Sequence, residues 1–317
     1  MIDVIIPAYN AHKTIEKTLC SVAYQDYADK VCVYIIDDNS KNNYDKEINF
    51  FSKFIKIKQY TLDKNSGPGV ARQYGIEHSN GEFIVFLDSD DVLYDCYSLK
   101  KLYGKIKDDN SDIVIGNFIE ELEDKFYEHN SDTIWLHGKM YRRSFLEKYN
   151  IRFNDTRSNE DNGFNQSVFL CDSKVSYLND YVYIWIKNSN SITRRNDSDY
   201  VYKSLKWYVY NINYALECGL KNNCDIEKFS FLAFATIVAT YHYYLQFYDK
   251  EKWMNDMIEE CKKTYDLYKK YPINEEVKAF IMKQQYDYSF SEENANAFLN
   301  PIISFDMFLK KLGDDLC

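Results

Sequence analysis

Short apolar runs alternate with segments of helical spacing along the first part of the chain. The apolar runs span residues 2–8, 31–36, 56–61 and 83–87, and segments with helix-like periodicity separate them. Strands that alternate with helices pair in parallel, because parallel neighbours need a crossover connection, and those crossovers are nearly always right-handed. The pattern predicts a Rossmann-like α/β fold in which helices flank a mostly parallel sheet.

A polar cluster follows each of these four apolar runs. The clusters are Tyr9 with Asn10, residues 37–40, residues 63–69 and residues 88–91. Ligands of open parallel sheets bind beyond the carboxyl ends of the strands. The four clusters therefore predict one site along a single edge of the sheet.

The fourth cluster places three carboxylates, on Asp88, Asp90 and Asp91, directly after an apolar strand. Hard divalent ions such as Mn²⁺ or Mg²⁺ take carboxylate oxygens and share their remaining positions with waters and substrate phosphates. A polar loop that caps the next helix is the alternative, and it would be the better interpretation of an isolated Asp-x-Asp. The strand and helix pattern before this cluster favours a metal site.

The motifs at these strand ends resemble those of family-2 glycosyltransferases, which have the nucleotide-diphospho-sugar-binding GT-A fold. The resemblance covers about the first hundred residues, weakens up to about residue 195, and does not extend to the rest of the chain. It rests on Val4-Ile5-Ile6-Pro7-Ala8-Tyr9-Asn10, Ile35-Ile36-Asp37-Asp38-Asn39-Ser40, Asn65-Ser66-Gly67-Pro68-Gly69-Val70-Ala71-Arg72 and Phe86-Leu87-Asp88-Ser89-Asp90-Asp91.

The resemblance implies a donor site at these motifs. Pro7 and Tyr9 would flank the nucleobase, Asp38 would accept a hydrogen bond from a uracil imide, and Asn65 and Arg72 would complete the base and phosphate contacts. Asp90, helped by Asp88 and with Ser89 between them, would hold the metal at the diphosphate.

The chemistry of the individual residues agrees with these roles. A carboxylate accepts from an imide N–H but not from a ring nitrogen acceptor, so Asp38 favours uracil or thymine over adenine. Arg72 carries a planar fork that suits phosphate oxygens. Gly67 and Gly69 allow backbone geometry that other residues avoid, and Pro68 suits a first helical turn. The alternative is that Asp38 is a cap, Arg72 a solvated helix charge and the glycines an ordinary turn.

A glycosyl transfer also needs a base that deprotonates the acceptor hydroxyl. The resemblance places this role on Asp161 of the segment Asn159-Glu160-Asp161-Asn162-Gly163-Phe164, with Glu160 as second choice. The alternative is that Asn159 caps a helix over residues 160–171 and that the two acids complement the helix dipole.

Two further segments are expected to close the site. His137 could contact the metal or phosphate and Lys139 could reach the diphosphate, although a lone histidine is more often structural. The segment 188–195 resembles a mobile loop that covers the diphosphate in relatives, and its Ser191, Arg194 and Arg195 offer donors to a phosphate. A solvated basic loop is the alternative there.

Composition narrows the classes of partner. A chain of 317 residues exceeds the usual limit for a single core, so we expect a GT-A domain over 1–200 and a helical domain over 201–317. The net charge of −10 argues against a nucleic-acid partner. Eight cysteines without a Cys-x-x-Cys pair argue against zinc and for reduced cytoplasmic thiols, and the start of the chain reads as a strand rather than a signal peptide.

The pattern after about residue 200 is helical, over 225–248, 251–268, 275–286 and 292–312. The apolar run 229–247 is long enough for a membrane span, but its hydroxyl and imidazole groups favour a buried helix. A contact with the membrane surface, at the inner face, or a homo-oligomer through these helices is the intermediate interpretation.

Together these features predict a metal-dependent inverting glycosyltransferase that moves a sugar from a UDP-sugar to a saccharide or other hydroxyl acceptor, in bacterial surface polysaccharide or glycoconjugate synthesis. One alternative keeps the fold but changes the acceptor to a protein side chain or a modified nucleobase. Another is an inactive sugar-nucleotide-binding scaffold, against which the intact Asp88, Asp90 and Asp161 count. The sequence does not specify the sugar or the acceptor.

Overall fold

The computed structural model describes residues 1–122, 125–186, 198–227 and 229–230, together with the single positions 233, 236, 262, 263 and 266. Its contacts divide the chain into two compact units, residues 1–194 and 195–317, and each unit is described by itself. This division falls six residues before the boundary expected from the sequence. The roles expected for the two domains stay predictions.

The first unit is built on one mixed sheet, whose nine strands among the described residues run in the order β3-β2-β1-β4-β8-β6-β9-β5, with β7 paired to β6. The expected α/β fold is confirmed. The four strands β3, β2, β1 and β4 pair in parallel, whereas pairing beyond β4 is mixed. The strands are β1 (Ile2–Ala8), β2 (Val31–Asp37), β3 (Lys56–Thr61), β4 (Phe83–Phe86), β5 (Val92–Leu93), β6 (Ile113–Leu122), β7 (Lys125–His129), β8 (Lys139–Arg142) and β9 (Val175–Trp185).

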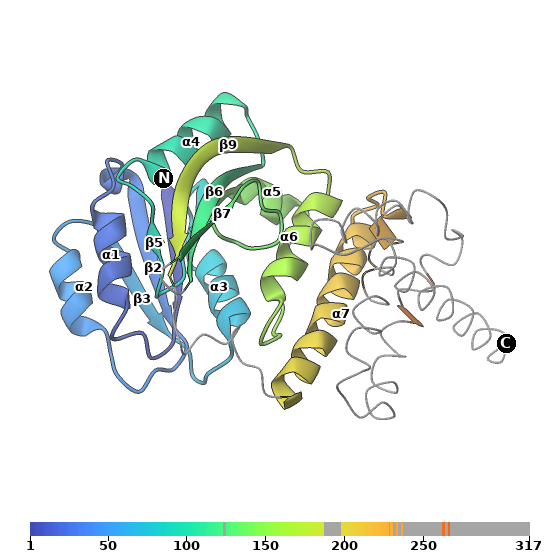
Figure 1. Cartoon of the computed structure of the whole chain (residues 1–317), viewed down its shortest axis with the longest axis horizontal. Helices are drawn as coiled ribbons and strands as arrows, with labels where there is room; N and C mark the ends of the chain where they lie inside the picture. Colours follow the sequence, from blue (N-terminus) through green and yellow to red (C-terminus); the bar gives the residue numbers. More distant parts are fainter. Residues whose placement is uncertain are drawn as a thin grey trace. The chain divides into compact units, whose positions relative to one another are not determined.

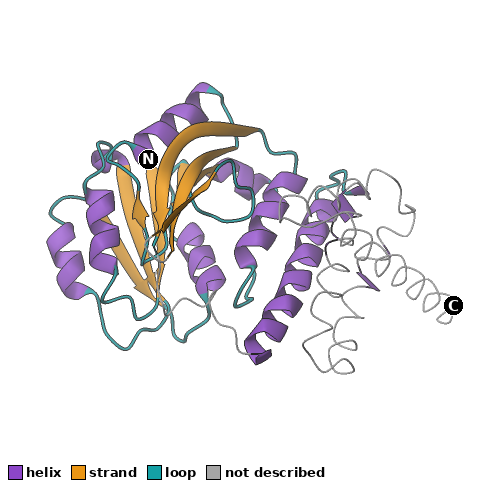
Figure 2. Ribbon diagram, viewed as in Figure 1, coloured by secondary structure: helices purple, strands orange, loops and turns teal. Residues whose placement is uncertain are grey.

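Helices cover both faces of this sheet (Figures 1 and 2). Figure 1 shows α1 and α2 on one side of β1 to β4 and α3 and α6 on the other. The helices of the first unit are α1 (Ile15–Ala23), α2 (Asp45–Phe51), α3 (Pro68–Glu77), α4 (Ser98–Asp108), α5 (Arg143–Lys148) and α6 (Glu160–Leu170), and a 3₁₀ turn spans Ala28–Lys30.

The alternation of side chains along each strand supplies a core to both faces. On one face, Val4 of β1 and Val33 of β2 join Leu19 of α1 and Leu102 of α4 in a single apolar cluster. On the other face α3 lies close to the sheet at Gly75, where an added Cβ would come within 2.5 Å of Ile5. The buried strands therefore hold helices on both sides and leave their carboxyl ends free to form a site.

A buried ion pair fixes the sheet near the amino-terminal ends of β1 and β4. The Arg143 guanidinium lies 2.9 Å from Oδ2 of Asp3, and it also donates to the carbonyls of Gly81 (2.6 Å) and Ile76 (2.8 Å). Asp3 is fully buried, and the Arg143 guanidinium compensates the burial of its carboxylate. The pair anchors α5 to the strand that begins the chain.

Helix α7 (Ser198–Lys221) is the described helix of the second unit. It lies before the stretches expected to be helical, and those stretches fall almost entirely outside the described residues, as does most of the apolar run 229–247. Among the residues that the structure describes, no helix combines the length and apolarity that a membrane crossing needs.

Candidate active site

The four polar clusters follow the carboxyl ends of β1, β2, β3 and β4, as expected from the sequence. Hydrogen bonds join the loops: the Asp38 amide donates to the Ala8 carbonyl at 2.8 Å, and the Asn39 side chain donates to the Asp63 carbonyl at 2.6 Å. Three loops that are far apart in the sequence thus meet at one edge of the sheet. Pro7 lies half-buried within β1, and the Tyr9 ring just beyond β1 is 50% exposed, so it is available to stack on a ligand.

Asp38 organises the loop between β3 and α3. Its Oδ1 accepts from the Ser66 amide at 2.6 Å, and its Oδ2 accepts from the Gly67 amide at 2.7 Å. Each carboxylate oxygen has a second lone pair, so these bonds leave acceptor capacity for a ligand. The buried Asp38 therefore holds this loop in place, a structural role like the alternative that the sequence left open.

Glycines allow this loop to approach the loop before α6. Gly67 has φ +99°, a conformation that favours glycine, and Pro68 occupies the first turn of α3 as expected. A Cβ on Gly69 would lie 2.7 Å from the Asn154 carbonyl oxygen and 2.9 Å from Glu160 Cγ. The absence of a side chain at Gly69 thus allows the start of α3 to pack against the loop before α6, so this glycine is needed for a close contact rather than for a turn.

Arg72 joins the acidic turn after β4 to the acids that begin α6. One guanidinium nitrogen lies 2.6 Å from Asp88 Oδ1 and another lies 2.7 Å from Glu160 Oε1, and Arg72 is only 5% exposed. Burial alone would lower the pKa of Arg72, but Asp88 and Glu160 outweigh it and raise the pKa, so the guanidinium stays charged. Burial likewise opposes the ionisation of Asp88, yet Arg72 holds its pKa below the usual range.

The acidic turn brings Asp88 and Asp91 next to His137. Potential ligand atoms of these three residues lie within 4.8 Å of one another, and His137 Nε2 is 3.9 Å from a carboxylate oxygen of each acid. Burial lowers the pKa of His137, which favours the neutral imidazole that binds metals. Its Nδ1 is buried and has no hydrogen-bond partner among the described residues.

This donor set fits a hard divalent cation, which takes carboxylate oxygens and tolerates an imidazole. Ligand atoms about 2.0–2.1 Å from one Mg²⁺ lie at most about 4.2 Å apart, so a small side-chain shift would bring the three groups to one ion. Asp90, expected from the sequence to be the main ligand, and Ser89 are half-buried in the same turn.

Asp91 belongs to the acidic cluster of the sequence but was not assigned as a metal ligand, and the structure also gives it a supporting role. Its Oδ2 accepts from the Tyr183 hydroxyl at 2.6 Å and its Oδ1 accepts from the Ile186 amide at 2.8 Å, which ties the turn to β9. Burial, followed by the charges of Asp88 and Asp90, raises its pKa well above the usual value. The run of three aspartates was the available sequence signal for this residue.

Lys139 is fully buried in β8, and its ammonium donates to the Trp135 carbonyl. Asp132 Oδ1 lies 3.7 Å away and also accepts from the Trp135 amide at 2.8 Å. Burial lowers the pKa of Lys139 to about 8. In this arrangement Lys139 supports the loop that carries His137, and its reach to a diphosphate stays a prediction.

Asp161 and Glu160 begin α6, but their environments differ. Glu160 is 6% exposed and pairs with Arg72, whereas Asp161 is partly buried and its Oδ1 accepts from the Asn162 amide at 2.8 Å. Burial, together with the charge of Glu160 and against that of Arg72, raises the pKa of Asp161 to about 7. A carboxylate with such a pKa can accept a proton near neutral pH.

The alternative of a side-chain cap on α6 is wrong. Asn159 has the left-handed conformation, with φ 62°, and its side chain makes no capping hydrogen bond to the helix. Ser191, Arg194 and Arg195 lie outside the described residues.

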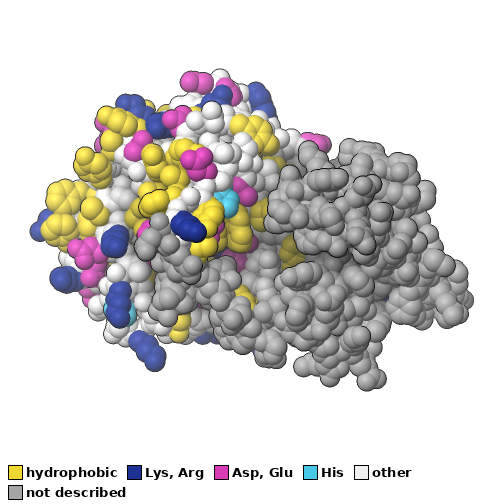
Figure 3. Space-filling model, in the orientation of Figure 1, with side chains coloured by type: hydrophobic (Ala, Val, Ile, Leu, Met, Phe, Trp, Pro, Cys, Tyr) yellow, Lys and Arg dark blue, Asp and Glu magenta, His cyan; other side chains and the backbone are white. Residues whose placement is uncertain are grey.

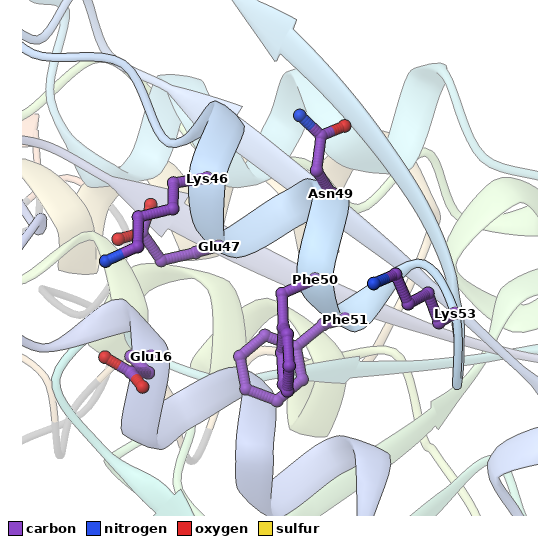
Figure 4. Close-up of a pocket in the computed structure, with 7 residues that line it drawn as sticks. All are labelled: Glu16, Lys46, Glu47, Asn49, Phe50, Phe51 and Lys53. Atoms are coloured by element: carbon purple, nitrogen blue, oxygen red, sulfur yellow. The ribbon is translucent and has the colours of Figure 1, made fainter.

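A cavity of about 530 Å³ beside α1 and α2 contains none of these residues (Figure 4). Glu16 of α1 lines it together with side chains of α2 and the following turn, among them Phe50 and Lys53. The face seen in Figure 3 likewise mixes charges of both signs with apolar side chains. The lining of the cavity thus combines charges of both signs with aromatic rings.

Comparison with known proteins agrees with a glycosyltransferase fold. Residues 3–159 match the family model described as Glycosyl transferase family 2. The chain belongs to this family over residues 3–159, the part that carries most of the site.

Two curated relatives are bacterial glycosyltransferases. The chain is 28% identical over 222 residues to Glycosyltransferase GlyA of Streptococcus pneumoniae, covering 61% of this chain and 31% of GlyA. It is 28% identical over 200 residues to the poly(ribitol-phosphate) beta-N-acetylglucosaminyltransferase TarS of Staphylococcus aureus, covering 58% of this chain and 35% of TarS. The chain thus spans about a third of the length of these relatives.

Solved structures share the fold. A crystal structure of Staphylococcus aureus TarS in complex with UDP-GlcNAc matches with a TM-score of 0.67 at 19% identity, covering 98% of this chain and 91% of that one. Mannosyltransferase PcManGT of Pyrobaculum calidifontis, in complex with GDP-Man and Mn²⁺, matches with a TM-score of 0.54 at 14% identity, covering 96% of this chain and 86% of that one. The expected GT-A fold is confirmed.

Proposed function

We propose that this protein is a metal-dependent, inverting glycosyltransferase that moves a sugar from a UDP-sugar to a saccharide or polyol hydroxyl in the synthesis of a bacterial surface glycopolymer. The observation that carries the proposal is the Arg72 bridge. It brings Asp88 of the acidic turn and Glu160, the neighbour of Asp161, onto one buried guanidinium. A cation site for the diphosphate and a base for the acceptor are therefore held together.

The donor would lie along the carboxyl ends of β1 to β4. The Tyr9 ring would stack on the base, Asp38 would accept from the uracil imide with its remaining lone pairs, and Asn65 would contact the base edge. Asp88 and Asp90 would hold Mn²⁺ or Mg²⁺, with His137 beside them, and a bound ion would neutralise the charge that develops on the leaving diphosphate.

Asp161 would take the proton of the acceptor hydroxyl as the oxygen attacks the anomeric carbon. The proton moves to Asp161, the new glycosidic bond forms, and the bond from the sugar to the diphosphate breaks. A single displacement of this kind inverts the anomeric centre. The raised pKa of Asp161 suits this role, because a base works best when its pKa lies near the working pH.

UDP-GlcNAc is the first donor to test, because TarS was crystallised with it, and the name of TarS indicates a polyol-phosphate acceptor. A contact with the membrane surface and a homo-oligomer through the second unit remain proposals.

A thermal-shift screen of UDP-, GDP- and CDP-sugars, with Mn²⁺ or with EDTA, tests the donor assignment, because ligands that bind only the native state raise its apparent stability. We expect uridine nucleotides to give the largest shift and Mn²⁺ to increase it. Donor hydrolysis, followed as release of UDP, then distinguishes an active enzyme from a binding scaffold. An equal shift with GDP-sugars, or full hydrolysis in EDTA, would contradict the proposal.

A further inference from the structure

Arg157, which lies outside all the sequence motifs, connects the loop before α6 to the loop before α3. Its guanidinium donates to the side-chain Oδ1 of Asn65 and, at 2.6 Å, to the backbone carbonyl of Asn65. Its aliphatic stem fills the space beside Gly67, where an added Cβ would lie 3.0 Å from Arg157 Cδ. Both arms of the Arg157 fork are therefore directed at one asparagine.

This contact determines which end of the Asn65 amide is presented to a ligand. An asparagine side chain has an oxygen that accepts and a nitrogen that donates, whereas a guanidinium can only donate. Arg157 can therefore pair only with Oδ1 of Asn65. A flipped amide would place two donors against each other, so the Nδ2 group is the one left for the ligand.

We propose that Arg157 sets the nucleobase preference of the donor site by holding the Asn65 amide in this single orientation. The inference rests on the proposed function, because it takes Asp38 and Asn65 to face the base. Uracil presents an N–H flanked by two carbonyl oxygens, whereas cytosine presents a ring nitrogen acceptor beside an amine donor. An acceptor on Asp38 and a donor on Asn65 match the uracil pattern, and a donor on Asn65 opposes the cytosine amine.

Arg157 acts here as a positioning residue, and its exposure makes it suitable for substitution. Arg157→Ala frees the Asn65 amide to flip, so that its oxygen could accept from a cytosine amine. Arg157→Lys keeps the charge but lacks the planar fork that reaches both oxygens of Asn65. Arg152→Ala is the matched control, because Arg152 is also exposed, lies five residues earlier on the same segment, and pairs with Glu77 instead.

The experiment measures dissociation constants for UDP and CDP by calorimetry, in the wild type and in these three variants of the full chain. The two nucleotides share ribose and diphosphate, so their ratio isolates the base. We expect the UDP preference to fall about 5- to 20-fold in Arg157→Ala and to fall in Arg157→Lys, and to be unchanged in Arg152→Ala.

A wild type that prefers UDP, together with an Arg157→Ala variant of unchanged preference, would overturn this inference alone. Equal weakening of UDP and CDP would also overturn it, because Arg157 would then be a general support or a phosphate attractor. A wild type without a preference for UDP would instead overturn the proposed donor.

Discussion

Asp161→Asn should lower the rate of sugar transfer and, at neutral pH and above, raise the free energy of unfolding. The substitution keeps the size of the side chain and an oxygen that can accept from the Asn162 amide, but it removes the basicity. If Asp161 takes the acceptor proton, we expect the transfer rate to fall by roughly 10²–10⁴-fold, while the affinity for the donor changes little.

The stability change follows from the raised pKa of Asp161, which is about 7 instead of the usual 3.8. Between these two pH values the folded protein keeps a proton that the unfolded chain releases, so the free energy of unfolding of the wild type falls as the pH rises. A difference of about 3 units between the two pKa values corresponds to a loss of at most about 4 kcal/mol in the free energy of unfolding, at 1.36 kcal/mol per unit. Because Asp161 is only partly buried, we reduce this to about 1–3 kcal/mol.

The assay compares melting temperatures of the two proteins from pH 4 to pH 8.5, in EDTA, so that no cation shifts the titration. We expect equal stability near pH 4 and a higher melting temperature for Asp161→Asn above pH 7, by about 2–4 °C per kcal/mol. Asp155→Asn, an exposed acid on the same loop, is the control and should change neither quantity. A near-normal transfer rate in Asp161→Asn would refute the reasoning and move the base to Glu160 or beyond this segment.

Three further substitutions test other parts of the site and the fold. Asp90→Ala should abolish Mn²⁺-dependent release of UDP without changing the melting temperature in EDTA, and residual Mn²⁺ activation would mean that Asp88, Asp91 and His137 suffice. Asp38→Ala leaves the Ser66 and Gly67 amides without their acceptor, so the free energy of UDP binding measured by calorimetry and the free energy of unfolding should each fall by about 1–3 kcal/mol. Asp63→Ala, at an exposed position, should change neither. Arg143→Ala should cost about 3–5 kcal/mol in urea unfolding because it leaves Asp3 buried without its partner, and a loss below 1 kcal/mol would contradict that account.

The sequence predicted the parts of this protein that depend on local pattern. Strands β1 to β4 lie where the apolar runs placed them, and helices α1, α2 and α3 lie in the segments of helical spacing between them, because buried residues leave a regular signal in the sequence. The positive φ of Gly67 and the position of Pro68 were also predictable from the sequence, because each reflects the conformational limits of a single residue.

The contacts that assemble the site were not predictable in this way. Arg72 and Glu160 are 88 positions apart, and Arg157 and Asn65 are 92 positions apart. No periodicity connects such pairs, and each arginine alone reads as a solvated charge. Only the fold shows that Arg72 is buried between two acids and that Arg157 spans two loops.

The charge balance of the site connects these observations. Asp88, Glu160 and Asp161 act on one buried guanidinium, that of Arg72, and Asp91 lies in the same acidic turn as Asp88. The raised pKa values of Asp91 and Asp161 have burial as their first cause and neighbouring carboxylates as the next. Such crowding of like charges opposes folding, and proteins retain it where it serves a function. A divalent cation at the acidic turn would offset the repulsion there, while leaving Asp161 beside Glu160 with a pKa suited to accept a proton. On the proposed function, the same excess of acids would supply both the cation site and the base, and Arg72 would hold the two at a fixed separation.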